Sequence, residues 1–355
     1  MTEVLDRLIA ATIPEDIFGR LAGTSDERLA QIRHRYRALA PQAHPDNVSA
    51  SDRERATRAF ANLSRLKAQA DAAITNPPVI SSRRHSYALD GPAQTADIAT
   101  LYPVRFGDPP TCGLLKVADR PRDNDLLIQE SDILRHLRTP NQPEALGFRP
   151  LLPTIIESFD LSRDAARHRV NAFAHVPGFY NLETIGKVFP TGLDPKHVAW
   201  IWRQLLLVLG YSHSRAVVHG SVLPHHILIH PAHDLLLVDW CFAVRDPAET
   251  GTHIPAISDR YADWYPAEVL SQTAPSPATD IYMSARCMLD LLKGRAETNT
   301  QDNPRLTAFL QSCLIPAPSR RPQDAWALRD EFTKLIEQLW GPRRRIPFDM
   351  PTNHQ

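Results

Sequence analysis

The sequence has few cysteines, no net charge and no long hydrophobic run. Its four cysteines in 355 residues form no CxxC pair, which argues against a zinc ribbon or a disulfide framework and indicates a reducing compartment. Lysine plus arginine and aspartate plus glutamate number 40 each, so no global field attracts nucleic acid or an anionic membrane. The N-terminus lacks an apolar signal core, and the longest apolar helical run, 198–211, is too short to span a bilayer. We therefore expect a cytoplasmic protein with no nucleic-acid or membrane partner.

The chain changes character between residues 76 and 86. Residues 13–75 are polar, rich in arginine and helical by pattern. The stretch NPPVISSRRHS at 76–86 has no hydrophobic period, and after it short apolar runs mix with helical patterns. We expect a helical domain at 1–75, a linker at 76–86, a second domain at 87–342 and a tail at 343–355.

Two helices joined by a short loop are predicted in the first part. An apolar stripe at three- and four-residue steps is formed by Leu29, Ile32, Tyr36 and Leu39. A second helix is expected from Ser51 to about Ile74. The loop between them contains His44-Pro45-Asp46, in which Pro45 fixes its own φ and favours an extended His44.

Residues 13–75 resemble a J domain, the module by which DnaJ-type co-chaperones engage DnaK-type heat-shock ATPases. The resemblance rests on YRALA at 36–40, followed at the expected distance by the HPD tripeptide. It implies a helical hairpin whose tip binds the chaperone; the alternative is a polar loop whose His and Asp only cap helices. The residues implied for chaperone binding are His44, Pro45, Asp46, Tyr36, Arg33 and Arg37.

A series of segments in the second part follows a recognisable order. CGLLKVA at 112–118 carries Lys116, and LLIQESDIL at 126–134 carries Glu130. Four further segments are LLLVDWCFA at 235–243, WYPAEVL at 264–270, DIYMSARCMLDLLKG at 280–294 and PSRRP at 318–322. In this order they resemble a bilobal protein kinase. The fold class expected for the whole chain is therefore a multidomain α plus α+β protein.

The kinase resemblance implies roles for individual residues. Lys116 and Glu130 match the ion pair that grips the α- and β-phosphates of ATP, and Asp239 matches the metal-binding aspartate. Fold-keeping roles are implied for His219, Trp240, Glu268, Asp280 and Arg321, with Glu268 paired to Arg321 and Asp280 holding the catalytic-loop backbone.

The stretch VVHGSVLPHHILI at 217–229 keeps the apolar frame of a kinase catalytic loop but loses its polar residues. Ser221, Leu223 and His226 stand where the family has aspartate, lysine and asparagine. Serine cannot accept a proton at neutral pH, leucine has no charge, and neutral imidazole is a poor ligand for Mg²⁺. No GxGxxG precedes Lys116, so the phosphate cradle is absent or rebuilt. The retained Lys116, Glu130 and Asp239 permit ATP binding with one Mg²⁺ at Asp239.

We therefore predict that the chain is not an enzyme. It is interpreted as a co-chaperone that recruits and stimulates a DnaK-type ATPase, while an inactive kinase-like domain binds a client or partner protein. The alternative is a divergent kinase-fold enzyme that transfers a phosphoryl or nucleotidyl group from ATP. A metal site built from His219, His225, His226, His230 and His233 is not expected, because these side chains should point in different directions.

Overall fold

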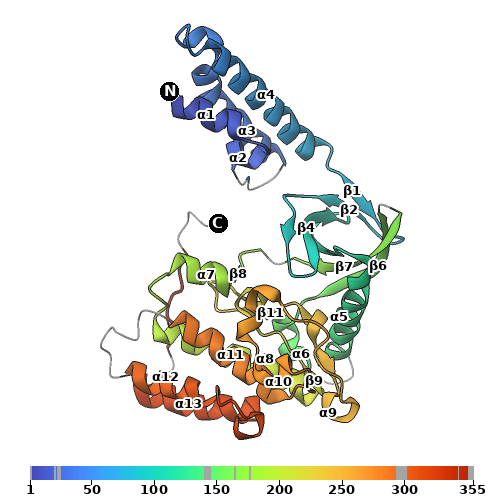
Figure 1. Cartoon of the computed structure of the whole chain (residues 1–355), viewed down its shortest axis with the longest axis vertical. Helices are drawn as coiled ribbons and strands as arrows, with labels where there is room; N and C mark the ends of the chain where they lie inside the picture. Colours follow the sequence, from blue (N-terminus) through green and yellow to red (C-terminus); the bar gives the residue numbers. More distant parts are fainter. Residues whose placement is uncertain are drawn as a thin grey trace. The chain divides into compact units, whose positions relative to one another are not determined.

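The structure is a computed structural model that describes residues 2–19, 21, 25–139, 145–163, 165–175, 177–292, 302–342 and 344–350 (Figure 1). It divides into two compact units. The first unit contains Met1–Pro92 with Pro103–Thr111, and the second contains Ala93–Tyr102 with Cys112–Gln355. Part of the predicted tail, Arg343 and residues 351–355, lies outside the described residues.

The first unit begins with a helical bundle. Its helices are α1 (Thr2–Ala10), α2 (Pro14–Phe18), α3 (Ser25–Ala43), the short 3-10 helix η1 (Pro45–Asn47) and α4 (Arg53–Thr75). Helices α3 and α4 lie side by side in Figure 1, and Ile32 of α3 is fully buried with Leu63 and Leu66 of α4. Complete burial of one such side chain contributes about 1.5–3 kcal/mol to folding, so this apolar face holds the hairpin together.

The HPD tripeptide lies between α3 and α4. His44 is extended, with φ −71° and ψ 130°, as the following proline favours, and its side chain is 45% exposed. Asp46 is 82% exposed at its side chain, and both Arg33 and Arg37 are exposed on α3. Tyr36 is half-buried, with its hydroxyl 3.3 Å from Ser64 Oγ. This helical part is compatible with a J domain.

The stretch 76–86, which is expected to be a linker because it has no hydrophobic period, contains strand β1 (Val79–Ser81). This strand pairs antiparallel with β2 (Ser86–Leu89), with Ile80 opposite Tyr87. Ser82 Oγ accepts the N–H groups of Arg84 at 3.0 Å and His85 at 2.9 Å, which stabilises the turn. A three-residue strand is too short to produce a visible alternation in the sequence, which explains the difference.

The second unit contains an antiparallel sheet that carries the N-terminal part of the predicted site. Strands β5 (Thr111–Ala118), β7 (Ala166–Ala174) and β6 (Ile155–Arg163) are neighbours in that order, and Lys116 lies opposite Asn171. Helix α5 (Asn124–Leu137) packs on β6 and β7. Strand β3 (Gln94–Thr95) pairs with the first half of β4 (Ala99–Phe106), and the two are joined by a tight turn.

The rest of the second unit is mainly helical around a large apolar core. Its α-helices are α6 (Ala145–Phe148), α7 (Leu182–Val188), α8 (Pro195–Ser214), α9 (Pro247–Thr250), α10 (Ala267–Leu270), α11 (Pro277–Leu291), α12 (Asp302–Ser312) and α13 (Ala325–Trp340). Helix α8 packs against α11 and α13, and Trp202 of α8 is completely buried. Gly210 is required on α8, because a Cβ there would lie 2.2 Å from a ring atom of Trp326.

Short strands and 3-10 turns position the loops of this unit. The strands are β8 (Tyr180–Asn181), β9 (Val217–Val218), β10 (Ile227–Ile229), β11 (Leu235–Leu237) and β12 (Val244–Arg245). The 3-10 turns are η2 (Pro121–Asp123), η3 (Arg149–Leu151), η4 (Pro224–His226), η5 (Trp240–Phe242), η6 (Asp259–Trp264) and η8 (Pro318–Arg320). Among the described residues, no helix combines the length and apolarity needed to cross a membrane.

Candidate active site

A buried group of three charges forms the centre of the candidate site. Strand β5 supplies Lys116 and α5 supplies Glu130, and Lys116 Nζ lies 3.0 Å from Glu130 Oε1. The same ammonium contacts Asp239 Oδ1, and the side chains of Lys116, Glu130 and Asp239 are 5%, 2% and 9% exposed. The Nδ2 of Asn171 donates to Glu130 Oε2 at 2.9 Å and fixes that carboxylate.

Burial and mutual attraction determine the charge state of this group. Burial alone would lower the pKa of Lys116, but the carboxylates of Asp239 and Glu130 together outweigh it and raise the pKa well above its usual range. Burial opposes ionisation of Asp239, but the attraction of Lys116 and His226 holds its pKa well below the usual range. Burial raises the pKa of Glu130. Lys116 is therefore a permanent cation facing the Asp239 carboxylate at neutral pH.

The turn that carries Asp239 is held by its own side chains. Asp239 has a left-handed backbone with φ 67°, and Cys241 Sγ donates to its Oδ1 at 2.7 Å. Trp240 donates from Nε1 to Leu237 O at 2.8 Å and packs edge-on against His219, with ring centroids 4.6 Å apart. Burial raises the pKa of the Cys241 thiol well above its usual range, so the sulfur stays protonated.

The loop before η4 is organised by Asp280 at the start of α11. Its carboxylate accepts the backbone N–H groups of His219 and Gly220, each at 2.8 Å, and lies 2.8 Å from His213 Nε2. Gly220 has φ 75°, a conformation that residues with a Cβ rarely adopt, and a Cβ there would lie 3.0 Å from Ile254. A larger residue at this position would therefore strain the loop. Asp280 thus fixes the backbone just before Ser221.

The three residues that replace the polar residues of a kinase catalytic loop are buried and have other partners. Ser221 Oγ lies 2.9 Å from the hydroxyl of Tyr265, and Leu223 is completely buried in the core. His226 Nδ1 lies 2.7 Å from Ser221 O, and Nε2 lies 2.9 Å from Asp239 Oδ2. Burial alone would lower the pKa of His226, but the carboxylates of Asp239 and Asp97 and the carbonyl of Ser221 together outweigh it and raise the pKa to about 9.

The sequence did not point to Asp97, which the structure brings to the same loop. Asp97 lies in the turn between β3 and β4, and its Oδ2 is 3.1 Å from His225 Nε2 and 3.6 Å from His226 Nε2. Ser258 Oγ donates to Asp97 Oδ1 at 2.9 Å. No spacing in the sequence could reveal this contact, because 128 residues separate Asp97 from His225.

The histidines behave only partly as predicted. His219 binds Val238 O through Nε2 at 3.0 Å, His230 Nδ1 accepts from Ala232 N at 3.0 Å, and His233 Nε2 lies 2.7 Å from Ile346 O. These three point to separate places. The expectation that His225 and His226 also diverge is wrong, because the 3-10 turn brings both rings, with centroids 3.9 Å apart, to Asp97.

Glu268 and Arg321 form a buried bidentate pair away from this loop. Arg321 Nη2 lies 3.1 Å from Glu268 Oε2, while Nη1 binds Oε1, and Thr279 Oγ1 donates to the same carboxylate at 3.2 Å. The guanidinium lies over the ring of Tyr282, 4.6 Å from its centroid. The pair joins α10 to the segment before α13, which is a structural role.

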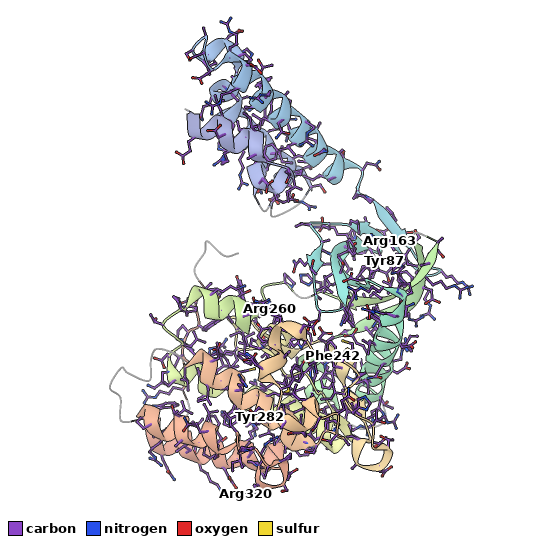
Figure 2. All side chains as sticks on the ribbon, viewed as in Figure 1. Tyr87, Arg163, Phe242, Arg260, Tyr282 and Arg320 are labelled. Atoms are coloured by element: carbon purple, nitrogen blue, oxygen red, sulfur yellow. The ribbon has the colours of Figure 1, made fainter. Side chains whose placement is uncertain are left out.

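A groove of about 400 Å³ lies beside η4. Its lining includes Leu182 and Glu183 of α7, Pro224 of η4, and Tyr261 and Trp264 of η6. Arg260 pairs with Glu183, with Nη2 2.6 Å from Oε1 (Figure 2). The hydrogen bonds of Lys187 and Arg260 outweigh the effect of burial and lower the pKa of Glu183, so the groove presents a carboxylate and aromatic rings next to the candidate site.

We found curated relatives among protein kinases, although no protein-family model matches the chain. Aurora kinase A-A of Xenopus laevis is 22% identical over 228 residues, which make up 64% of this chain and 50% of that protein. Serine/threonine-protein kinase PAK mbt of Drosophila melanogaster is 23% identical over 184 residues, 46% of this chain and 28% of that protein. Serine/threonine-protein kinase PrkC of Bacillus subtilis is 25% identical over 143 residues, 40% of this chain and 22% of that protein.

The chain spans half or less of the length of these curated relatives. The matches show that it contains a protein-kinase-like domain, in agreement with the expected fold of the second part. The resemblance of the first part to a J domain finds no support among them.

These relatives contradict our functional interpretation. Each of them is a protein kinase by name, so the prediction of a co-chaperone with an inactive kinase-like module is wrong, and so is the prediction that the chain is not an enzyme. A tripeptide such as HPD occurs by chance in unrelated proteins, so it is weak evidence for a co-chaperone. The altered catalytic loop is likewise weak evidence for an inactive domain. Loss of standard residues does not by itself remove ATP chemistry from a fold.

Proposed function

We propose that this chain is a divergent kinase-fold enzyme that transfers a phosphoryl or nucleotidyl group from ATP to an acceptor, with Mg²⁺ as the accompanying metal. The observation that carries the proposal is the buried contact of Lys116 with both Glu130 and Asp239. A protein with no use for this group gains little from it, since replacing a buried ion pair by apolar side chains is often neutral or stabilising.

The residues present fit ATP and Mg²⁺. Asp239 offers carboxylate oxygen, the ligand type that Mg²⁺ prefers, and would hold the metal. Bound Mg²⁺ supplies charge neutralisation on the phosphates. Lys116 would bind phosphate oxygens through its permanent positive charge, and Glu130 keeps the ammonium in place through the 3.0 Å contact. Because the group is nearly dry, each of these electrostatic interactions is stronger than in water.

The altered loop changes how the acceptor is activated. Ser221 cannot accept a proton, so the position that in kinases orients and deprotonates the acceptor has no base. A positioned general base contributes roughly 10²–10⁴-fold to a rate, and we expect turnover slower than that of a complete kinase by about this factor. The groove beside Pro224, with Glu183 and two aromatic rings, is the surface we propose for the acceptor.

Calorimetric titration of ATP with Mg²⁺ tests this proposal. We expect saturable binding to the wild-type chain and to Lys334→Met, a substitution of an exposed lysine on α13, and loss of binding in Lys116→Met. Circular dichroism of each variant verifies that it is folded. Absence of binding to the wild-type chain at millimolar ATP would overturn the proposal.

A further inference from the structure

Three potential metal ligands converge beside η4. They are Asp97 from the turn between β3 and β4, and His225 and His226 from η4 itself. One ligand atom from each lies within 4.8 Å of the other two. Asp97 Oδ2 is the common neighbour, 3.1 Å from His225 Nε2 and 3.6 Å from His226 Nε2.

The orientation of His226 is that of a metal ligand. Its Nδ1 lies 2.7 Å from the carbonyl oxygen of Ser221, and because a carbonyl only accepts, Nδ1 carries a proton. Histidines that bind metals usually donate their second ring N–H to a carbonyl or carboxylate in this way, which leaves Nε2 for the ion.

The Nε2 atom of His226 is buried and lacks a hydrogen bond. The residue is 1% exposed, and although Asp239 Oδ2 lies 2.9 Å from Nε2, no hydrogen bond forms there. A distance of 2.9 Å is short enough for a hydrogen bond, so it is the angle that is unfavourable. The carboxylate lies out of line with the ring nitrogen. Among the described residues, His226 Nε2 therefore has no hydrogen-bond partner.

The local charge also favours a cation at this place. The carboxylates of Asp97 and Asp239 both approach His226 Nε2, at 3.6 Å and 2.9 Å, and Lys116 contacts the other oxygen of Asp239. Asp97 further receives the hydroxyl of Ser258 on Oδ1, which leaves Oδ2 directed at the histidines. A divalent ion bound to the two imidazoles and Asp97 Oδ2 would displace the second ring proton of His226, and the carboxylates of Asp97 and Asp239 would face the charge of the ion.

Imidazole nitrogen decides which ion fits. Two histidines and one carboxylate suit Zn²⁺ and other divalent transition ions, with a further position left open for water or substrate, whereas Mg²⁺ prefers oxygen ligands. We propose that Asp97, His225 and His226 bind a divalent transition-metal ion of the Zn²⁺ class. This site goes beyond the proposed ATP chemistry and needs no nucleotide, so each can fail without the other.

Such an ion would connect two segments that are 128 residues apart in the chain. One is the turn that follows β3, and the other is η4, which directly follows Leu223. Binding to the folded state alone stabilises it, so the metal would raise the melting temperature, and the rise would grow with the logarithm of the free metal concentration above the Kd.

Titration of Co²⁺ into the metal-free, full-length protein without nucleotide tests the site. Visible absorption reports binding to nitrogen and oxygen ligands, and competition with Zn²⁺ and Mg²⁺ reports selectivity. We expect one Co²⁺ per chain, displaced by Zn²⁺ and unaffected by millimolar Mg²⁺. Asp97→Asn and His225→Ala should each weaken binding by roughly 100-fold or more, since even residues behind the ligands contribute 10- to 100-fold.

The matched control is His253→Ala, which removes an exposed histidine in the segment before η6 and should bind Co²⁺ like the wild type. Asp97 and His225 lie on the accessible side of the group, with side chains 19% and 17% exposed, so both variants should fold and decide the question even if His226 variants do not. Absence of Co²⁺ binding, displacement by Mg²⁺ as readily as by Zn²⁺, or equal affinity in all variants would overturn the proposal.

Discussion

His226 Nε2 lies 2.9 Å from Asp239 Oδ2, so an imidazole faces the carboxylate that the kinase resemblance assigns to the metal. Asp239 Oδ1 contacts Lys116 at the same time. The carboxylate is therefore held between two basic side chains, each from a different element. This arrangement keeps the position of Asp239 fixed.

Replacing Lys116 should reduce both stability and nucleotide binding. Lys116→Met leaves Glu130 and Asp239 as buried carboxylates without their ammonium partner, and breaking one partner from a buried ion pair costs about 3–5 kcal/mol. Urea denaturation measures this cost. Lys334→Met, at an exposed position, should change the free energy of unfolding by less than about 0.5 kcal/mol. Equal stability of the two variants would contradict the role of Lys116.

Ser221→Ala should leave ATP turnover nearly unchanged, because this serine cannot act as the base. The substitution removes the 2.9 Å contact with the Tyr265 hydroxyl and should lower the free energy of unfolding by about 1 kcal/mol. Steady-state turnover and urea denaturation measure the two effects. Tyr265→Phe removes the same contact and also the acceptor of the Ser258 N–H at 3.1 Å, so it should lower the free energy of unfolding further, by about 1–3 kcal/mol, with turnover again nearly unchanged. A loss of more than about tenfold in turnover for Ser221→Ala alone would mean that the serine takes part in the reaction.

Stability should fall in acid through His219. Burial lowers the pKa of this histidine to about 4 and outweighs the hydrogen bond of Nε2 to Val238 O, which raises it. The Nδ1 atom accepts from Ser221 N at 3.3 Å, which suits the neutral ring. The unfolded chain then binds more protons than the folded chain between about pH 6.5 and pH 4. The loss over this window is on the order of 3 kcal/mol, and there is no loss from this group above about pH 6.5.

Chemical denaturation at a series of pH values, compared between wild type and His219→Gln, isolates this contribution from that of the carboxylates. The difference between the two proteins should shrink as the pH falls toward 4. A difference that is constant with pH would show that His219 is not held neutral.

Removing both partners of the Glu268–Arg321 pair should cost less than the sum of the two single removals. Arg321→Met leaves a buried carboxylate and should destabilise the fold by about 3–5 kcal/mol. The double variant Glu268→Gln with Arg321→Met should be destabilised by less than the sum of the two single effects. In the double variant no buried charge is left without its partner. Urea denaturation of all four proteins provides the cycle. Additive effects would contradict a direct interaction.

Sequence analysis located the residues that lie within recognisable motifs. It missed contacts between segments that are far apart in the sequence. The kinase resemblance implied the ion pair of Lys116 with Glu130 and a metal-binding role for Asp239, but not the contact of Lys116 with Asp239. Asp97 was missed because it lies in an unremarkable turn, and its partners are 128 residues away. Tyr265 stood inside a recognised segment, yet its contact with Ser221 depends on how that segment folds back onto the loop.

The functional prediction failed for a related reason. The sequence shows that Ser221, Leu223 and His226 replace charged or amide side chains, but it does not show what surrounds them. In the structure His226 faces Asp239, and the three-charge group of Lys116 is intact. The sequence therefore shows which catalytic-loop residues are replaced, but not that the contacts of Lys116 with Glu130 and Asp239 are kept.

Incubation of the full-length chain with ATP labelled at either the γ- or the α-phosphate is the most direct test of ATP-dependent group transfer. We expect label on an acceptor or on the chain itself in the wild type, with ADP as product if a phosphoryl group moves and pyrophosphate if a nucleotidyl group moves. The signal should be lost in Lys116→Met and kept in Lys334→Met. Neither ADP nor pyrophosphate formed above the rate of the Lys116→Met protein would contradict the account.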